Sequence, residues 1–488
     1  MVRLFFSGLT WVAVLGALCG RAQGAGFEIL DPGIVSMGRA GAYVARADDL
    51  SAMEANPAGL SKQTGPIFQV GLGLARLDLT FTRRGSGDFV NLEGRQVRDP
   101  ALDPETGGPF AAVSPSGAGS LTPAPFLVGA WGNAFRVPGL TLALGLLPSS
   151  FVVGRGYPET GPQRYLTRKT DGVMLFYGVA VAFRFHRLFS VGATLLNGFV
   201  KTEREVAVRP FAQPYNDVTE NEDRFEDHVF KLSVGDALIP VLRLGLLSAP
   251  LPWLELGLSA RWPVSLSASG SLGYRPPENP AFQESFVACD RYPQPCAGAA
   301  QLGVEQRLPW ILRLGARWVQ PRFDVEFDAA LELWSRASVT DIRPQAVFVQ
   351  VRDGIPDPPV KIENTRLDRK LQDVLSLRLG GDVRVLEPLS LRAGVFRASS
   401  ALPSSHESFS LDFPFSSHWG VACGASYAIV SGWGVSVAYQ HIFQPQVRVT
   451  RGTVQQMTAT RPNLGNVINN GQYEVGVDVL GVSLEGRI

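Results

Sequence analysis

A strict alternation of apolar and polar side chains over nine or more residues is the feature that most limits how this sequence can fold. Residues 323–334 place apolar side chains on one face and, on the other face, the four acids Asp324, Glu326, Asp328 and Glu332. Residues 254–262 and 479–488 repeat the alternation. A period of two predicts β-strands with one apolar and one polar face.

Short turns and long polar connections alternate between these strands. The short turns lie at 137–139, 186–187, 249–252, 320–322, 386–388 and 431–432, and the long connections near 83–122, 154–170, 207–226, 275–302, 343–370, 400–416 and 450–471. Outer-membrane barrels have short periplasmic turns and long external loops, whereas soluble domains seldom have connections of such length. The pattern predicts an all-β fold, a transmembrane antiparallel β-barrel.

Fourteen strands fit between these connections. We expect them near 66–82, 124–136, 140–153, 171–185, 188–206, 227–248, 253–273, 303–319, 323–341, 373–385, 389–399, 417–430, 433–449 and 472–488. An even number of strands places both ends of the barrel on the periplasmic side.

Periodicity alone does not show which strand face points inward. A soluble sandwich buries the apolar face, whereas a membrane barrel turns that face to lipid. After residue 24 there is no run of about 18 apolar residues, which excludes an ordinary transmembrane helix. Several tryptophans fall near predicted strand ends, as aromatic belts at the membrane interfaces require, and the alternative is ordinary core packing. They are Trp131, Trp253, Trp262, Trp310, Trp318, Trp334 and Trp433.

The first 24 residues have the features of a secretory signal peptide. Arg3 is followed by an apolar run from Leu9 to Cys19 and by a small-x-small cleavage site ending at Gly24. A lipoprotein attached at Cys19 is the less favoured alternative because Leu18 is bulky. We expect a signal peptide over 1–24, an N-terminal segment over 25–65 and the barrel over 66–488.

Composition argues against several classes of function. The 45 Lys and Arg nearly balance the 44 Asp and Glu, so no basic surface for nucleic acid is expected. The chain has five His and lacks Gly-x-Ser-x-Gly and His-Glu-x-x-His motifs. We therefore predict no catalytic residues and no metal site. An outer-membrane hydrolase is the less favoured alternative.

Three cysteines follow the signal peptide. Cys289 and Cys296 share one Pro- and Gly-rich connection, and in an oxidising compartment a disulfide between them is favoured over a metal site. Cys423 is expected to be unpaired.

The segment Ala25–Ser61 resembles the start of the FadL/TodX family of outer-membrane transporters for hydrophobic compounds. The resemblance rests on Ala25-Gly26-Phe27, Gly38-Arg39-Ala40, Ala47-Asp48-Asp49 and Asn56-Pro57-Ala58. It continues more weakly at Arg307-Leu308-Pro309, Leu333-Trp334-Ser335 and Asn470-Gly471-Gln472-Tyr473. It implies passive transport without a cofactor, in a barrel whose N-terminal segment, the hatch, lies in the lumen.

The same resemblance implies a gate and a sideways exit. Ala25, Gly26 and Phe27, with Asn56, Pro57 and Ala58, are the expected hatch and gate residues. The exit is implied at a kink in the third strand, where Gly145 and Pro148 lie. Proline removes a ladder hydrogen bond, which gives a physical reason for a break in pairing. The alternative is that the strand simply ends early.

A buried carboxylate needs a cationic partner. In the family a basic residue late in the fifth strand helps to hold the ligand's head group, and its match is Arg204 in the stretch 201–204, with Thr202 and Phe27 as further candidates. A second basic position of the family is occupied by Gln372, and the nearby Arg369 and Lys370 are candidates to replace it. Alternatively, Arg204 pairs with Glu203, Glu205 or another lumen acid.

The resemblance therefore implies uptake of hydrophobic molecules, with long-chain fatty acids favoured. Neutral aromatic hydrocarbons, which require only an apolar pocket, are the alternative, and a nonselective porin is less favoured. The expected partners are these small molecules, the outer-membrane lipid and lipopolysaccharide, and the protein is expected to be a monomer.

Overall fold

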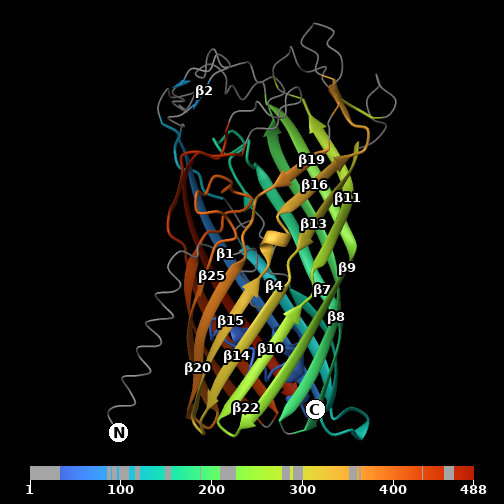
Figure 1. The fold of residues 1–488 in the computed structure, drawn as a ribbon, viewed down its shortest axis with the longest axis vertical. Coiled ribbons are helices and arrows are strands. Elements are labelled where there is room, and N and C mark those ends of the chain that lie inside the picture. Colours follow the sequence, from blue (N-terminus) through green and yellow to red (C-terminus); the bar gives the residue numbers. More distant parts are fainter. Residues whose placement is uncertain are drawn as a thin grey trace.

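A closed β-barrel forms the body of the molecule (Figure 1). The computed structural model describes residues 33–84, 89–90, 96–97, 109–115, 121–148, 155–186, 188–208, 227–276, 278, 286–289, 300–350, 360–361, 364–430, 432–454 and 467–487. The expected signal peptide lies outside these ranges. The long connections gather at the upper end in Figure 1, which is the external end of an outer-membrane barrel.

Fourteen antiparallel strands build the wall, as the sequence predicts. Eight are continuous: β1 (Gly65–Arg83), β4 (Leu121–Gly132), β7 (Lys169–His186), β8 (Phe189–Val208), β9 (His228–Leu251), β21 (Leu389–Ala398), β22 (His418–Val430) and β25 (Gly471–Arg487). Six consist of two pieces: β5 (Leu140–Pro148) with β6 (Arg155–Gly156), β10 (Leu254–Arg261) with β11 (Val264–Arg275), β13 (Ala300–Leu308) with β14 (Ile311–Val319), β15 (Phe323–Glu332) with β16 (Val339–Pro344), β19 (Thr365–Asp368) with β20 (Val374–Leu386), and β23 (Trp433–Phe443) with β24 (Val447–Val449). Pairing of β1 with both β25 and β4 closes the ring.

Short strands also form two small sheets in the connections. They are β2 (Phe89–Val90), β3 (Gln96–Val97), β12 (Phe286–Ala288), β17 (Phe348–Gln350) and β18 (Val360–Lys361).

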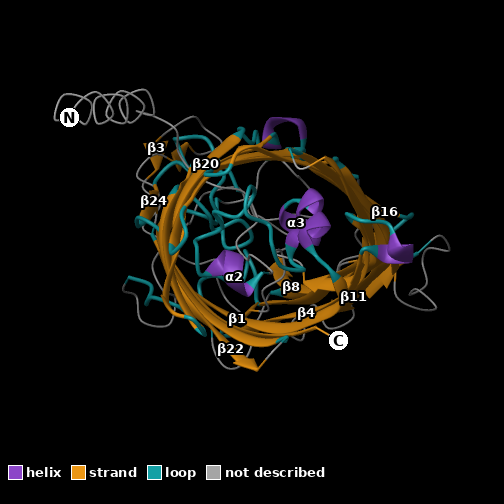
Figure 2. Cartoon of the chain, turned by 90° about the horizontal axis from the view of Figure 1, so that it is seen from below, coloured by secondary structure: helices purple, strands orange, loops and turns teal. Residues whose placement is uncertain are grey.

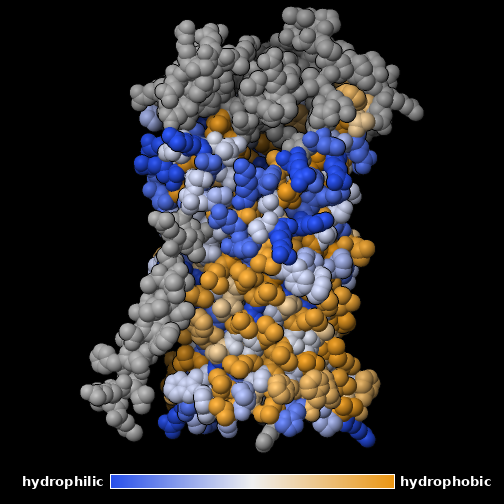
Figure 3. Space-filling model, viewed as in Figure 1, coloured by the Kyte–Doolittle hydropathy of each residue, from blue (hydrophilic) through white to orange (hydrophobic). Residues whose placement is uncertain are grey.

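Apolar side chains cover the outside of the wall, and on β15 the charged face points into the lumen. On β15, Val325 and Phe327 are 38% and 49% exposed, whereas Glu326 and Asp328 are buried. Figure 3 shows the apolar side chains gathered over the lower part of the barrel, with hydrophilic side chains above them. This arrangement is that of a membrane barrel and excludes a sandwich with a dry apolar centre.

Aromatic side chains mark both borders of the apolar band. Trp253 and Trp262 lie just beyond the two ends of β10, and both are exposed. Trp310 packs beside Trp262, with ring centroids 4.1 Å apart. The prediction is wrong for Trp334, which is fully buried and donates from Nε1 to Glu332 Oε2 at 2.6 Å. A 3₁₀ turn after β15 (Trp334–Arg336) turns this ring away from lipid.

An inner segment, residues 33–63, lies inside the ring of strands (Figure 2). It contains α2 (Ile34–Met37), α3 (Ala52–Ala55) and the 3₁₀ helix η1 (Pro57–Lys62). Nearly all of its side chains are buried. No helix among the described residues has the length and apolar character needed to cross a membrane.

Candidate functional site

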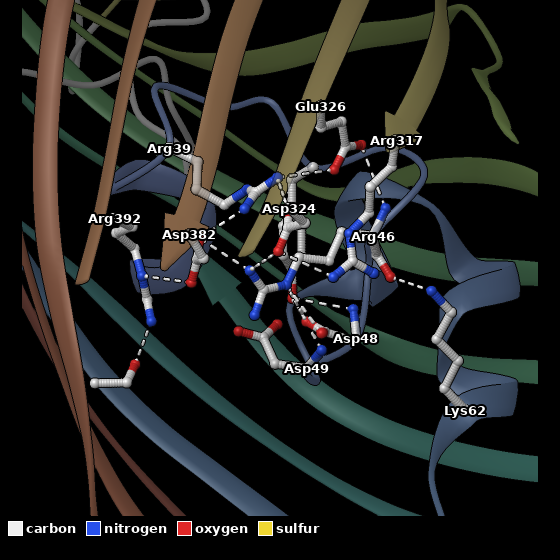
Figure 4. Close-up of polar contacts among 12 residues, drawn as sticks. Arg39, Arg46, Asp48, Asp49, Lys62, Arg317, Asp324, Glu326, Asp382 and Arg392 are labelled. Atoms are coloured by element: carbon white, nitrogen blue, oxygen red, sulfur yellow. Dashed lines mark hydrogen bonds and ion pairs between the residues drawn. The ribbon is translucent and has the colours of Figure 1, made fainter. Parts of the chain in front are cut away.

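Ion pairs fix the inner segment to the barrel wall (Figure 4). Arg39 Nη2 lies 2.8 Å from Asp324 Oδ1 and 3.2 Å from Glu326 Oε2, and Arg39 Nη1 lies 2.6 Å from Asp382 Oδ1. The Arg39 side chain is 0% exposed. The three carboxylates come from β15 and β20, so one side chain ties the inner segment to two strands.

A second arginine extends this network. Arg46 lies 2.9 Å from Asp48 and from Asp382, and 3.4 Å from Asp324. On the wall, Arg317 bridges Asp324 at 3.0 Å and Glu255 at 2.8 Å. The acids of β15 therefore bind both the barrel wall and the inner segment.

The irregular backbone of the inner segment is bound by the same acids. The N–H groups of Tyr43 and Val44 donate to Asp328 Oδ2 at 2.6 and 2.9 Å, and that of Ala45 donates to Glu326 Oε1 at 2.6 Å. Buried N–H groups outside regular structure need such partners. The acids on the polar face of β15 therefore fix the backbone of residues 43–45.

The Asn56-Pro57-Ala58 tripeptide has both a local and a long-range role. Asn56 is the N-cap of η1: its Oδ1 accepts from Ala58 N at 3.2 Å, and Pro57 occupies the first helical position. The Asn56 amide also donates to Val44 O at 2.8 Å and to Leu246 O of β9 at 3.1 Å. The tripeptide is thus a turn after a short helix and also an attachment to the wall.

Inward-facing glycines allow the inner segment to approach the wall closely. A Cβ at Gly245 would lie 2.0 Å from Asn56 Oδ1, and one at Gly192 would lie 2.3 Å from Pro57 C. Glycines on four other strands meet Arg39, Val44 or Ala45 in the same way: Gly257, Gly315, Gly380 and Gly394. These close contacts were not predicted from the sequence, although the glycines break the alternation at those positions.

Among the described residues, the third barrel strand pairs with β7 up to the predicted proline, Pro148, and pairs with it again at Arg155 and Gly156. The ladder continues without interruption through Gly145, which pairs with Val128 and Gly178. Pairing of β5 with β4 stops at Leu146, although β4 continues for six further residues to Leu121, and pairing with β7 stops at Pro148. Within the described residues, 121–126 of β4 therefore have a strand partner only on the β1 side.

A second interruption, which the sequence analysis did not predict, lies between β9 and the pair β10–β11. The ladder stops at Arg243–Arg261 and resumes at Gly235–Ser269. Asp236 Oδ2 accepts from Ser267 N at 2.9 Å inside this gap. A side chain thus replaces part of the missing ladder here.

Arg204 and Asp412 form the centre of an outer basic cluster, which we define as Arg155, Arg204, Arg369 and Asp412. Arg204 Nη2 lies 2.6 Å from Asp412 Oδ2 and also donates to Leu166 O. Arg155 Nη1 donates to Leu411 O at 2.6 Å. Arg204 thus contacts the Asp412 carboxylate directly, and Arg155 binds the backbone of the residue before it.

Arg369 belongs to this cluster, and Lys370 does not. The Arg369 guanidinium lies 5.9 Å from the centre of the Phe413 ring. Burial lowers the pKa of Arg369, Asp412 opposes this effect and Arg204 adds to it. Lys370 is exposed and has a left-handed backbone at φ 50°, with its N–H bound to Asp368. Thr202 donates to Asp171 O at 3.1 Å.

Two connections that fold inward enclose the cluster. Tyr157, Tyr165 and Leu166 come from the segment between β6 and β7, and Leu411 and Phe413 come from the segment between β21 and β22. All five are buried. The cluster thus combines an apolar surround with an excess of positive charge, which suits an amphipathic anion.

Several predicted residues cannot be placed. Ala25, Gly26 and Phe27 lie outside the described residues. Cys289 is disulfide-bonded, but Cys296 also lies outside them, so this pairing stays a prediction. Cys423 is free. Within the described ranges no cluster of three or more His, Cys, Asp or Glu could hold a metal ion.

One protein-family model matches almost the whole sequence. The model of the family described as "Outer membrane protein transport protein (OMPP1/FadL/TodX)" matches residues 15–483. No curated relative matches the chain by sequence.

Solved structures share the fold over almost the whole chain. A FadL homologue of Pseudomonas aeruginosa aligns with a TM-score of 0.71 at 13% identity, covering 95% of this chain and 99% of the homologue. The toluene transporters TodX of P. putida and TbuX of Ralstonia pickettii align with TM-scores of 0.61 and 0.60, each at 14% identity and the same coverage. At such identities the likeness establishes the fold alone.

Proposed function

Because the chain belongs to the OMPP1/FadL/TodX family of outer-membrane transport proteins, we propose that it carries hydrophobic molecules bearing a carboxylate, such as long-chain fatty acids, into the cell envelope. The family consists of Gram-negative outer-membrane transporters of hydrophobic compounds. The observation that supports a carboxylate is the outer basic cluster, where Arg204 and Arg369 lie among buried apolar side chains.

The proposed route enters at this cluster and leaves sideways. The inner segment acts as a plug along the barrel axis, because ion pairs and close glycine contacts fix it to the wall. The proposed exit lies at Pro148 of the third strand, because a proline removes a ladder hydrogen bond there. An exit into the bilayer suits a ligand that partitions into lipid. The protein is proposed to act as a monomer, surrounded by outer-membrane lipid and lipopolysaccharide.

A neutral aromatic hydrocarbon is the second candidate. Arg204 is already paired with Asp412, so its charge is matched without a ligand. An apolar molecule would then need only the surrounding rings. Two of the structurally similar proteins are described as toluene transporters.

Binding of oleate and of oleyl alcohol to the purified protein distinguishes these candidates. Arg204→Ala and Arg369→Ala should each weaken oleate binding by about tenfold or more, because a hydrogen bond to a charged group contributes about 1.5–3 kcal/mol. Binding of the alcohol should change little.

Lys370→Ala is the matched control, since Lys370 is a neighbouring exposed cation outside the cluster. Equal losses for oleate and the alcohol in the two arginine variants would contradict carboxylate recognition. Tight binding of toluene together with no preference for oleate would favour the second candidate.

A further inference from the structure

Asp412 contacts Arg204 through a carboxylate, which is also the head group of a fatty acid. It lies in a tight turn in which Phe413 N donates to Ser410 O at 3.1 Å. The bond from Arg155 to Leu411 O fixes the residue before it. The turn thus places a carboxylate 2.6 Å from the arginine proposed to hold the ligand's head group.

The Arg204–Asp412 pair is open to exchange. The two side chains are 34% and 21% exposed, whereas Arg39 in the inner-segment network is 0% exposed. A partly exposed pair can separate with water replacing the lost partner, so separation costs far less than in a buried network. A structural pair intended only to hold the fold has no need of this accessibility.

An arriving carboxylate must compete with Asp412 for Arg204. Arg369 lies close enough for its charge to interact with both groups, and so a second cation remains for whichever carboxylate is displaced. A ligand's apparent affinity is its intrinsic affinity multiplied by the fraction of molecules in which the binding group is available. A neutral ligand does not need Arg204, so Asp412 does not compete with it.

We propose that Asp412 is an internal stand-in for the ligand's carboxylate, which occupies Arg204 in the empty transporter and weakens carboxylate binding. This inference rests on the proposed function. Its consequence is a site that binds a fatty acid well enough to admit it and weakly enough to let it leave, which is a general requirement of conduction.

Asp412→Asn tests the proposal in the full-length protein. The variant should bind oleate about tenfold more tightly than the wild type, within the range usual for coupled binding. Oleyl alcohol affinity should stay unchanged. Asp412→Glu, which keeps the charge, should give no gain in oleate affinity, and Asp412→Ala, a second neutral variant, should give the same gain as Asp412→Asn.

The double variant Arg204→Ala/Asp412→Asn separates competition from a structural effect. If Asp412 acts by occupying Arg204, its removal should give no gain in oleate affinity once Arg204 is absent. Unchanged or weaker oleate binding in both neutral variants would overturn the proposal. So would an equal gain for oleyl alcohol. Failure of the proposed function has a different outcome: oleate binding by the wild type would not depend on Arg204 at all.

Discussion

Arg39 is the residue on which the position of the inner segment most depends. Its side chain is fully buried and contacts three carboxylates from two strands. Removal of one partner from a buried ionic network leaves uncompensated charge and costs about 3–5 kcal/mol. The acids left behind include Glu326, which also binds the backbone of Ala45.

Arg39→Met should therefore release residues 43–46 from the wall. Amide hydrogen exchange of Tyr43, Val44 and Ala45 should accelerate by about 100-fold or more, which corresponds to that free energy. Arg76→Met removes an exposed arginine whose side chain is 59% exposed, and it should leave these amides protected. Unchanged protection in Arg39→Met would show that the glycine contacts hold the segment without the ion pairs.

Sequence reasoning found the residues of the outer basic cluster only in part. Arg204 was found through the family resemblance. The sequence could not show which of Arg369 and Lys370 joins the cluster, because that depends on where each side chain lies in the folded protein. Asp412 carried no local signal: it lies about two hundred residues from Arg204, in a connection without periodicity. Contacts between distant loops depend on tertiary structure.

At the scale of elements, the glycines of β8 and β9 determine how closely η1 can approach the wall. Gly245→Val would place side-chain atoms where Asn56 Oδ1 now lies, and overpacking of this kind costs about 1–3 kcal/mol. Limited trypsin digestion should then cut after Lys62 or Arg46, which are largely buried in the wild type. Gly476→Val, at a site with nothing within 4 Å, should stay resistant. Equal resistance of both variants would contradict docking through the glycines.

Pro148 is the residue of β5 on which the proposed sideways exit depends. Pro148→Val restores a backbone N–H and favours continued pairing of β5, so uptake of labelled oleate should fall by about half or more while its affinity stays constant. Pro263→Val, at the other ladder interruption, is the matched control and should transport normally. A fall in uptake for Pro263→Val alone would move the exit to the gap between β9 and β11.

The strands were predictable because each repeats one physical rule over many residues. On β15 the alternation of apolar and polar side chains identified the strand. The long connections indicated a membrane barrel, in which the apolar face points outward to lipid. The inner segment has no such period, because its backbone is held by individual partners such as Asp328 and Gln69. The interruption between β9 and the pair β10–β11 was also not predicted, since Pro263 alone is typical of a local turn.

At the scale of the whole molecule, the barrel joins three features: an apolar outer wall, an inner segment bound by ion pairs in the lumen, and a proline in the third strand. A fourteen-stranded barrel with an empty lumen would be expected to conduct ions. The inner segment occupies it and is fixed to the wall on several sides. The account therefore requires that hydrophobic molecules cross without an open aqueous channel.

Ion current and oleate uptake, measured on the same reconstituted protein, test this requirement most directly. The wild type should show almost no steady current across a planar bilayer while labelled oleate still crosses into liposomes that contain it. Deletion of residues 33–63 should produce a large current, which controls for correct insertion. A large, steady current through the wild type would show an open pore and contradict the account.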